Sequence, residues 1–166
     1  MLTSSHSKCF ATVVAVAAGS SIAWGSPPSN WSGQGLAAAQ LEETTQINSE
    51  RIKFQTKGPV DTYAVKLVWQ PGGSSGWHHH PGLVLVQVAS GLVDVTRFEN
   101  GQCITTQYGV GSPNGSTFTE TASMHVGVSP GGAVAYATAI VADGAASRID
   151  DSVPSCATNF GVRRPK

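Results

Sequence analysis

The chain has 166 residues, enough for one domain with its own core, and its ten basic and ten acidic residues give no net charge. The basic residues do not cluster except at Arg163, Arg164 and Lys166, near the end of the chain. We therefore expect no nucleic acid and no anionic membrane surface among the partners, because both call for a basic patch.

Residues 1–25 have the order of a secretory signal peptide. Lys8 precedes a run of mostly small and apolar residues, 9–18, and a small-residue stretch follows before Ser26. A buried N-terminal helix is the alternative, but glycine and serine interrupt the run. We expect cleavage near Gly25 and export to the periplasm or the medium. We expect no membrane attachment afterwards, since the apolar run is too short to span a bilayer.

Residues 26–49 are predicted to form a poorly ordered leader. They are rich in Pro, Ser, Gly, Asn and Ala, a composition that buries little apolar surface. Within them, Leu36–Gln46 has two interpretations, a short helix or a run across the surface. The folded domain is expected over residues 50–157, followed by a C-terminal tail, 158–166.

Two-residue alternation dominates the chain after residue 50. Apolar residues alternate with polar ones over residues 51–55 and again from Tyr63 to Trp69, as in half-buried strands. Leu83–Ala89 is continuously apolar, which fits a strand that is buried on both faces or lines a barrel. Turns with Gly and Pro separate the strands, and no long helical period appears. The pattern predicts an all-β domain, either a sandwich or a barrel.

Three consecutive histidines lie within Gly76–Gly82, directly before this apolar run. Alternate side chains of a strand share a face, so His78 and His80 project together while His79 points the other way. Paired imidazoles suit a divalent metal ion such as Fe, Mn, Zn, Ni or Cu, and His125, well downstream, is a candidate third ligand. The alternative is that these are ordinary turn or surface histidines. The spacing predicts one divalent metal ion held by three imidazoles.

The cysteines are consistent with export. Removal of the signal takes Cys9 and leaves an even pair, Cys103 and Cys156, in an oxidising compartment. A disulfide between them would close a loop of about 54 residues and hold the C-terminal region on the domain. Two free thiols, buried or bound to metal, are the alternative. Neither cysteine has another metal-binding residue near it in the sequence, so the disulfide is favoured.

These residues resemble the cupin superfamily, whose members are small antiparallel jelly-roll barrels with a metal inside. Their first motif has a glycine, His-x-His, a glutamate and a closing glycine, and the residues that match it here are Gly72, His78, His80 and Gly91. Val84 stands at the position of the glutamate. In the second motif a histidine is followed four residues later by asparagine. His125 matches that histidine, and Ser129 takes the asparagine position.

The chain is more similar still to a group of exported bacterial cupin-domain proteins of unassigned activity. They share a Gly-Trp-His-x-His-Pro-Gly segment, a cysteine in mid-chain, and a tail that resembles Arg148–Asp150 with a later Pro154 and Cys156. The resemblance covers residues 50–157. It implies a single jelly-roll domain with a metal inside and, since dimers are frequent among similar proteins, a homodimer.

The missing motif glutamate changes the chemistry that the site is expected to have. Three neutral imidazoles leave a divalent ion its full double charge, which favours ionising a bound water or binding an anionic ligand. Glu120 is a candidate replacement, as a fourth ligand or a proton shuttle. It lies five residues before His125, on the opposite face of a regular strand unless the residues between them reset the alternation. Its other interpretation is a solvated loop acid.

Three functions are compatible with such a site. The first is a metal-dependent enzyme, dioxygenase-like or related, that acts on a small molecule in a mostly apolar barrel pocket. The second is a non-catalytic module that binds a metal or a small ligand. The missing glutamate and asparagine, and a shortage of acid–base residues, favour this second function. The third is a structural remnant whose histidines no longer bind metal.

Overall fold

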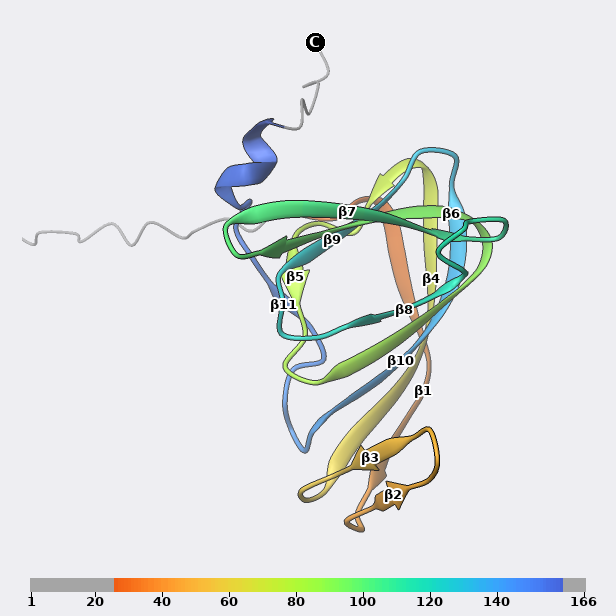
Figure 1. Ribbon diagram of the computed structural model, residues 1–166, viewed down its shortest axis with the longest axis vertical. Coiled ribbons are helices and arrows are strands. Elements are labelled where there is room, and N and C mark those ends of the chain that lie inside the picture. Colours follow the sequence, from red (N-terminus) through yellow and green to blue (C-terminus); the bar gives the residue numbers. More distant parts are fainter. Residues whose placement is uncertain (1–25, 160–166) are drawn as a thin grey trace, which may run out of the picture.

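The computed structural model describes residues 26–159, which form an all-β barrel with one short helix (Figure 1). The predicted signal peptide, 1–25, and most of the predicted tail, 160–166, lie outside the described residues. In the described part of the chain, no helix is long and apolar enough to cross a membrane. The strands of the main sheet are β1 (Ser29–Leu41), β4 (Val60–Ser74), β5 (His78–His79), β6 (Leu83–Glu99), β7 (Gln102–Gly109), β8 (Thr117–Glu120), β9 (His125–Ser129), β10 (Ala133–Ala142) and β11 (Ile149–Asp150). A separate hairpin consists of β2 (Gln46–Asn48) and β3 (Lys53–Gln55), and the 3-10 helix η1 is Ser155–Asn159.

The long strand β6 joins the two faces of the barrel. Its first half pairs with β10 and β8, and its second half pairs with β7 and β9, always antiparallel. The sheet runs in the order β1-β4-β10-β6-β9-β5-β11, and the end of β4 also pairs with β9. Gly91 lies where β6 passes between the two faces, with a φ of +74°. A Cβ atom there would collide with the carbonyl oxygen of Gly132, so this crossing requires glycine.

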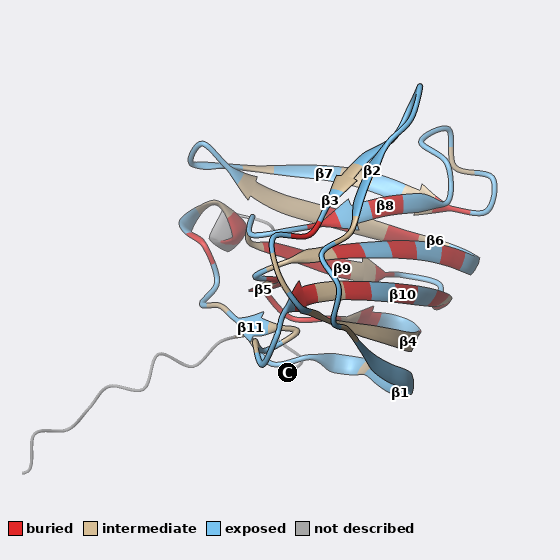
Figure 2. Cartoon of the chain, turned by 90° about the horizontal axis from the view of Figure 1, so that it is seen from below, coloured by how far each residue is buried: buried red, intermediate tan, exposed pale blue. Residues whose placement is uncertain are grey.

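The core lies between the inner faces of the strands, where buried and exposed residues alternate along β6 and β10 (Figure 2). The inward residues of β6 are Val84, Val86, Val88, Val93 and Val95, and those of β10 are Ala133, Ala135, Ala137, Ala139 and Val141. The apolar run Leu83–Ala89 therefore lines the barrel on one face and is exposed on the other, as at Leu85. The run of alanines on β10 leaves space inside the barrel that larger side chains would fill.

The poorly ordered leader predicted over residues 26–49 is wrong for most of its length. Residues 29–41 form β1, which pairs with β4 from Ser29 opposite Ser74 to Leu41 opposite Val60, and no helix forms at 36–46. The strand is stabilised by backbone pairing rather than by an apolar face. Its Gly- and Ala-rich sequence therefore lacks the alternation of apolar and polar residues by which a strand is predicted. One large side chain anchors it: Trp31 packs edge-on against Trp69, with ring centroids 6.3 Å apart. The folded domain therefore begins near Ser29 and not at residue 50.

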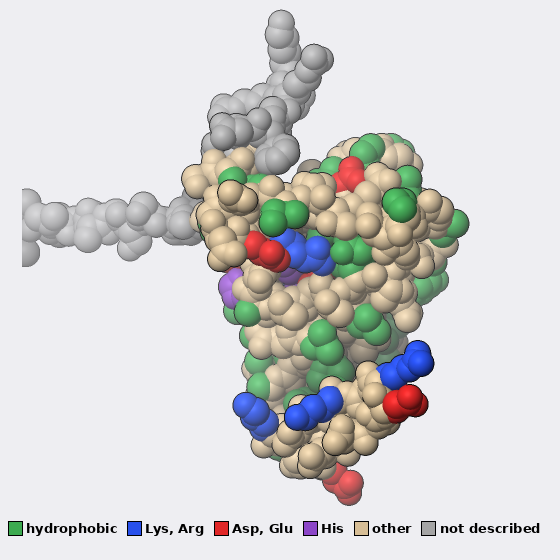
Figure 3. Space-filling view, viewed as in Figure 1, with side chains coloured by type: hydrophobic (Ala, Val, Ile, Leu, Met, Phe, Trp, Pro, Cys, Tyr) green, Lys and Arg blue, Asp and Glu red, His purple; other side chains and the backbone are tan. Residues whose placement is uncertain are grey.

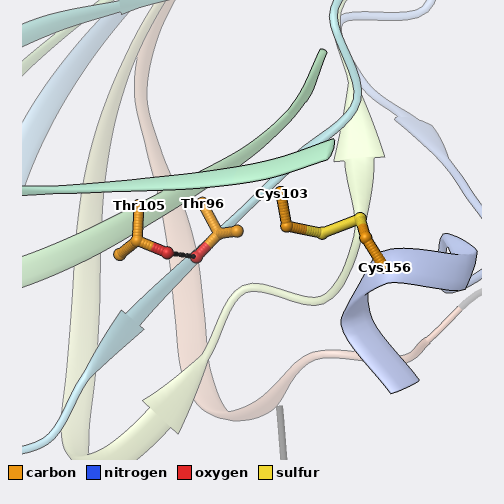
Figure 4. The surroundings of a disulfide bond; sticks show 4 residues. All are labelled: Thr96, Cys103, Thr105 and Cys156. Carbon is orange, nitrogen blue, oxygen red and sulfur yellow. Dashed lines mark hydrogen bonds between the residues drawn. A yellow bond between two sulfur atoms is a disulfide. The ribbon is translucent and has the colours of Figure 1, made fainter. Parts of the chain in front are cut away.

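A disulfide joins Cys103 on β7 to Cys156 in η1, as predicted (Figure 4). It fixes the last described segment of the chain to the barrel, across a sequence separation of 53 residues. The segment between β10 and Cys156 runs past β5, where Ile149 and Asp150 pair with His79 and His78. Residues 149 and 150 are therefore held beside the histidine motif.

Lysine and arginine side chains gather at the end of the molecule that carries the β2–β3 hairpin, while most of the face shown in Figure 3 is uncharged. Arg51 and Lys53 lie in or next to this hairpin. The hairpin projects from the lower end of the barrel in Figure 1, away from β5 and β11. Its charges are thus remote from the histidine motif.

Candidate metal site

The three predicted histidines meet inside the barrel. His78 on β5 is the direct antiparallel partner of His125 on β9, and His80 follows β5 by one residue. The ring centroids of His78 and His125 lie 4.3 Å apart, those of His78 and His80 5.0 Å, and those of His80 and His125 5.3 Å. All three are buried. His79 points the other way, as predicted, and its Nδ1 lies 2.8 Å from Asp151 Oδ2.

Backbone carbonyls fix the orientation and the tautomer of each ring. Nδ1 of His78 lies 2.8 Å from the carbonyl oxygen of Gly76, Nδ1 of His80 lies 2.6 Å from that of Ser147, and Nδ1 of His125 lies 2.7 Å from that of Ser123. A carbonyl oxygen only accepts, so each Nδ1 carries the proton and donates. Each Nε2 is left with a free lone pair, the form in which histidine binds metal ions.

Glu120 completes the cluster. Its Oε2 lies 3.2 Å from Nε2 of His80, and its Oε1 lies 3.3 Å from Nε2 of His125. In the tautomer that the backbone imposes, both Nε2 atoms are acceptors, as are the carboxylate oxygens of Glu120. Each nitrogen–oxygen contact is therefore repulsive unless a cation lies between the two atoms. Accordingly, Nε2 of His80 and of His125 are buried without a hydrogen-bond partner in the described part of the chain. A buried acceptor without a partner is costly, and a cation removes that cost.

The position of Glu120 explains how the site has a carboxylate although Val84 occupies the motif position. Val84 on β6 pairs directly with Glu120 on β8, so both side chains project to the same inner face. The carboxylate thus reaches the site from the neighbouring strand. Residues 121–124 leave the strand between Glu120 and His125, which resets the alternation that would otherwise separate the two.

The four residues fit a divalent ion. Their ligand atoms all lie within 4.8 Å of one another, so movements of a few tenths of an ångström would bring them to the separations of up to about 4.4 Å around a single ion with bonds of about 2.0–2.2 Å. Three imidazole nitrogens and one carboxylate suit Zn, Fe, Mn, Ni or Cu and do not select among them. The backbone carbonyls supply the outer hydrogen bonds that metal-binding imidazoles normally have.

The electrostatics of the site keep the ligands in the forms that bind metal. Burial, helped by the neighbouring His125, lowers the pKa of His78 from 6.5 to about 3, against the opposing influence of Glu120. Burial alone would raise the pKa of Glu120. Hydrogen bonds from His125 and His80 outweigh burial and hold that pKa below its ordinary value when their Nε2 atoms carry protons, and a cation between these atoms would act on the carboxylate in the same direction. At neutral pH, His78 is therefore neutral and Glu120 is ionised.

This arrangement predicts a specific acid sensitivity of the metal-free protein. Between pH 6.5 and pH 4.5 the unfolded chain binds a proton at His78 and the folded protein does not, so the free energy of unfolding falls as the pH falls. One such proton contributes a slope of about 1.4 kcal/mol per pH unit. Urea titrations of chelator-treated protein measure it. His78→Asn, which keeps a donor toward Gly76, should lose this part of the slope. An unchanged slope would show that His78 is not buried in its neutral form.

The carboxylate supplied by β8 has its own test. Glu120→Ala is expected to lower metal affinity by at least about tenfold, the lower end of what supporting residues of metal sites contribute. Adding Val84→Glu in that variant returns a carboxylate from the facing strand, and we expect it to recover most of the lost affinity. Competition with a chelating dye measures both. Thr119→Ala, on the exposed face of β8, is the matched control. Full affinity in Glu120→Ala would show that Glu120 is not a ligand.

A cavity of about 180 Å³ opens beside the cluster. His78, His80 and Glu120 lie on its wall, and the apolar part of the lining comes from β1, β4, β6 and β10: Trp31, Tyr63, Val65, Leu67, Val84, Ala137 and Ala139. Ser147 and Arg148, which precede β11, complete the lining. The mostly apolar pocket next to the histidines agrees with the prediction from the sequence. Tyr108 packs against Phe118 in the core and does not line this cavity.

Three residues of the site could not be identified from the sequence. Trp31 lies in the segment predicted to be a poorly ordered leader, and Arg148 entered only as part of a tail that resembles that of exported cupin-domain proteins. The contact of Ser147 with His80 is made by the backbone and leaves no signal in the sequence.

Comparison with protein-family models and with curated proteins finds no match. Among solved structures, the chain is similar to an oxalate oxidase in complex with glycolate, with 16% identity over 54% of this chain and 45% of that one and a TM-score of 0.44. It is also similar to an uncharacterized Klebsiella pneumoniae protein with a double-stranded β-helix domain (17% identity, 55% and 71% coverage, TM-score 0.44) and to the Lactobacillus farciminis oxalate decarboxylase (16%, 54% and 26%, 0.42). The chain spans about half the length of the oxalate oxidase chain.

These similarities bring no activity to this chain. The sheet is antiparallel throughout and closes into a barrel, and His78 and His80 of the first motif lie inside it beside His125 of the second. The fold, an antiparallel barrel with the three histidines inside, agrees with the cupin-type barrel that the sequence resemblance implied.

Proposed function

We propose that this protein is an exported cupin that holds one divalent metal ion and uses it to act on a small molecule in the adjoining cavity. The ion is held by Nε2 of His78, His80 and His125, with Glu120 as a fourth ligand. One observation carries the proposal: three lone pairs and an ionised carboxylate converge in the interior, an arrangement that is repulsive without a cation. The disulfide is compatible with export to an oxidising compartment.

The residues around the ion have two separate roles, positioning the ligands and leaving space for a substrate. The carbonyls of Gly76, Ser123 and Ser147 hold the three rings, so little reorganisation accompanies binding. The small side chains of Ala137 and Ala139 leave room for a substrate next to the ion. A bound ion of this kind supplies a Lewis acid, an activated water or, for iron, manganese or copper, oxygen chemistry. The apolar walls limit access of bulk water to the reacting atoms.

A non-catalytic binding module is the second candidate, and the cavity lining favours it. Apart from the four cluster residues, the ionisable groups on that lining are Tyr63 and Arg148. Glu120 is engaged with the imidazoles, so the described residues that line the cavity include no separate carboxylate or imidazole that could serve as a general base. A binding module would use the same ion to anchor a ligand without converting it.

Metal loading followed by an activity screen tests the proposal. The purified protein, stripped with a chelator, is dialysed against Fe, Mn, Zn, Ni or Cu, and bound metal is measured by mass spectrometry. We expect one equivalent of at least one ion, and uptake far below one equivalent for all five would contradict the proposal. Oxygen consumption with phenols and thiols then separates the candidates. Turnover that His78→Ala abolishes identifies an enzyme, whereas ligand binding without turnover identifies a binding module.

A further inference from the structure

Arg148 places a positive charge on the wall of the cavity. Its Nε donates to Oδ1 of Asp150 at 2.7 Å, and its Nη2 donates to the carbonyl oxygen of Ser75 at 2.7 Å. The guanidinium also lies over the ring of Trp31, 5.3 Å from the centroid. Three contacts thus hold a side chain that is 22% exposed. A guanidinium fixed in this way is prepared to bind an anion with little further loss of entropy.

These contacts leave part of the Arg148 guanidinium available to a ligand. The hydrogen bonds found within the described residues engage Nε and Nη2, which leaves the Nη1 donors for a ligand. Asp150 is 58% exposed, so water screens its charge, whereas the cavity side of Arg148 faces apolar residues. An anion in the cavity would therefore be attracted by the positive charges of both Arg148 and the metal ion.

The indole N–H of Trp31 is a second, independent feature that indicates a ligand with acceptor oxygens. Nε1 of Trp31 is buried and has no hydrogen-bond acceptor in the described part of the chain, although Trp31 lines the cavity. Most buried indole N–H groups find an acceptor. An acceptor oxygen on a bound ligand would satisfy this donor. Trp31 and Arg148, in contact with each other, thus present donors of the kind that recognise a carboxylate.

The other residues that line the cavity indicate the polarity and the size of the rest of the ligand. The walls from β4, β6 and β10 are mostly apolar, formed by Val65, Leu67, Val84, Ala137 and Ala139, with Tyr63 of β4 as the one residue among them that carries a polar group. The volume of about 180 Å³ is below the usual range of about 300–1,000 Å³ for pockets that hold drug-sized ligands. The ligand is therefore small, with one polar end and an otherwise apolar body.

We propose that the cavity binds a small monocarboxylate with an apolar body, its carboxylate lying between the metal ion and the donors of Arg148 and Trp31. This inference rests on the proposed metal site, because the ion is the second anchor of the carboxylate. Arg148 and Trp31 would set the specificity of the site for an anionic end group. The alanines of β10 would set the size limit of the apolar body.

Titration of the cobalt-loaded protein with benzoate tests the inference. Binding is followed by calorimetry and by the visible absorption of Co²⁺, which reports on a ligand that reaches the ion. We expect benzoate to bind and to change the spectrum, and its neutral isostere benzamide to bind at least about tenfold more weakly. Arg148→Gln is expected to lower the affinity for benzoate by at least about tenfold, as for the loss of a hydrogen bond to a charged group. Arg51→Gln, which removes the same charge near the β2–β3 hairpin, should leave binding unchanged.

Two further variants keep the test decisive if Arg148→Gln does not fold. Asp150→Asn removes the competing carboxylate and keeps the guanidinium, so benzoate affinity should be retained or increased. Trp31→Phe keeps the ring and removes the N–H donor, so affinity should fall while metal content stays at one equivalent. Equal binding of benzoate and benzamide, or an affinity that drops in Asp150→Asn, would overturn the inference. Failure of the wild type to load cobalt would be seen before any ligand is added and would overturn the metal site itself.

Discussion

His125→Ala is expected to lose at least about 100-fold in metal affinity, more than the loss of a supporting residue usually costs. His125 is the most deeply buried residue of the cluster, 1% exposed, and its Nε2 lies beside Glu120. Its removal leaves His78 and His80 from one short segment and Glu120 from β8, so that β9, the partner of β5, no longer supplies a ligand. Equilibrium dialysis followed by metal analysis measures the loss.

His79→Ala is the matched control for this variant. It removes an imidazole from the same motif, but one that faces outward and pairs with Asp151. We expect its metal affinity to equal that of the wild type, with at most a small loss of stability from the partly exposed ion pair. Equal losses in His79→Ala and His125→Ala would show that the metal is bound nonspecifically by the histidine run and not inside the barrel.

Removal of the disulfide is expected to have the largest effect on stability. The double variant Cys103→Ser, Cys156→Ser should lower the free energy of unfolding by about 4 kcal/mol, because the disulfide restricts a long loop in the unfolded chain. For a domain of this size the loss corresponds to a fall in Tm of about 12–20 °C. Differential scanning calorimetry under non-reducing conditions measures it.

The neighbouring pair Thr96 and Thr105 provides the control for this second prediction. Their hydroxyl groups share a hydrogen bond of 2.8 Å on the exposed face of β6 and β7 (Figure 4). Thr105→Val should change the free energy of unfolding by no more than about 1 kcal/mol. A double serine variant as stable as the wild type would mean that the C-terminal segment is held by its other contacts alone.

The strands were predictable where side chains alternate between core and solvent. The alternation in Tyr63–Trp69 is characteristic of a strand, and the apolar run Leu83–Ala89 indicated the long central strand. Strand β1 was not predictable in this way, because its small and polar residues pair through the backbone with β4. Its contribution depends on a partner that is distant in the sequence, which no local pattern records.

The site was predictable to the extent that its ligands follow strand geometry. The spacing of His78 and His80 indicated a shared face, and His125 was a candidate third ligand whose position also matched the second cupin motif. Glu120 could be named but not placed, because residues 121–124 decide its side of the barrel through their loop conformation. Arg148 is brought to the cavity by the pairing of β11 with β5, a contact between segments about 70 residues apart that the sequence does not specify locally.

An anomalous-diffraction map from crystals of the zinc- or cobalt-loaded protein tests the metal site most directly. One peak is predicted inside the barrel, within about 2.2 Å of Nε2 of His78, His80 and His125 and close to a carboxylate oxygen of Glu120. A peak at His79 on the outer surface, coordination through Nδ1, or full metal content with no peak at the cluster would contradict it.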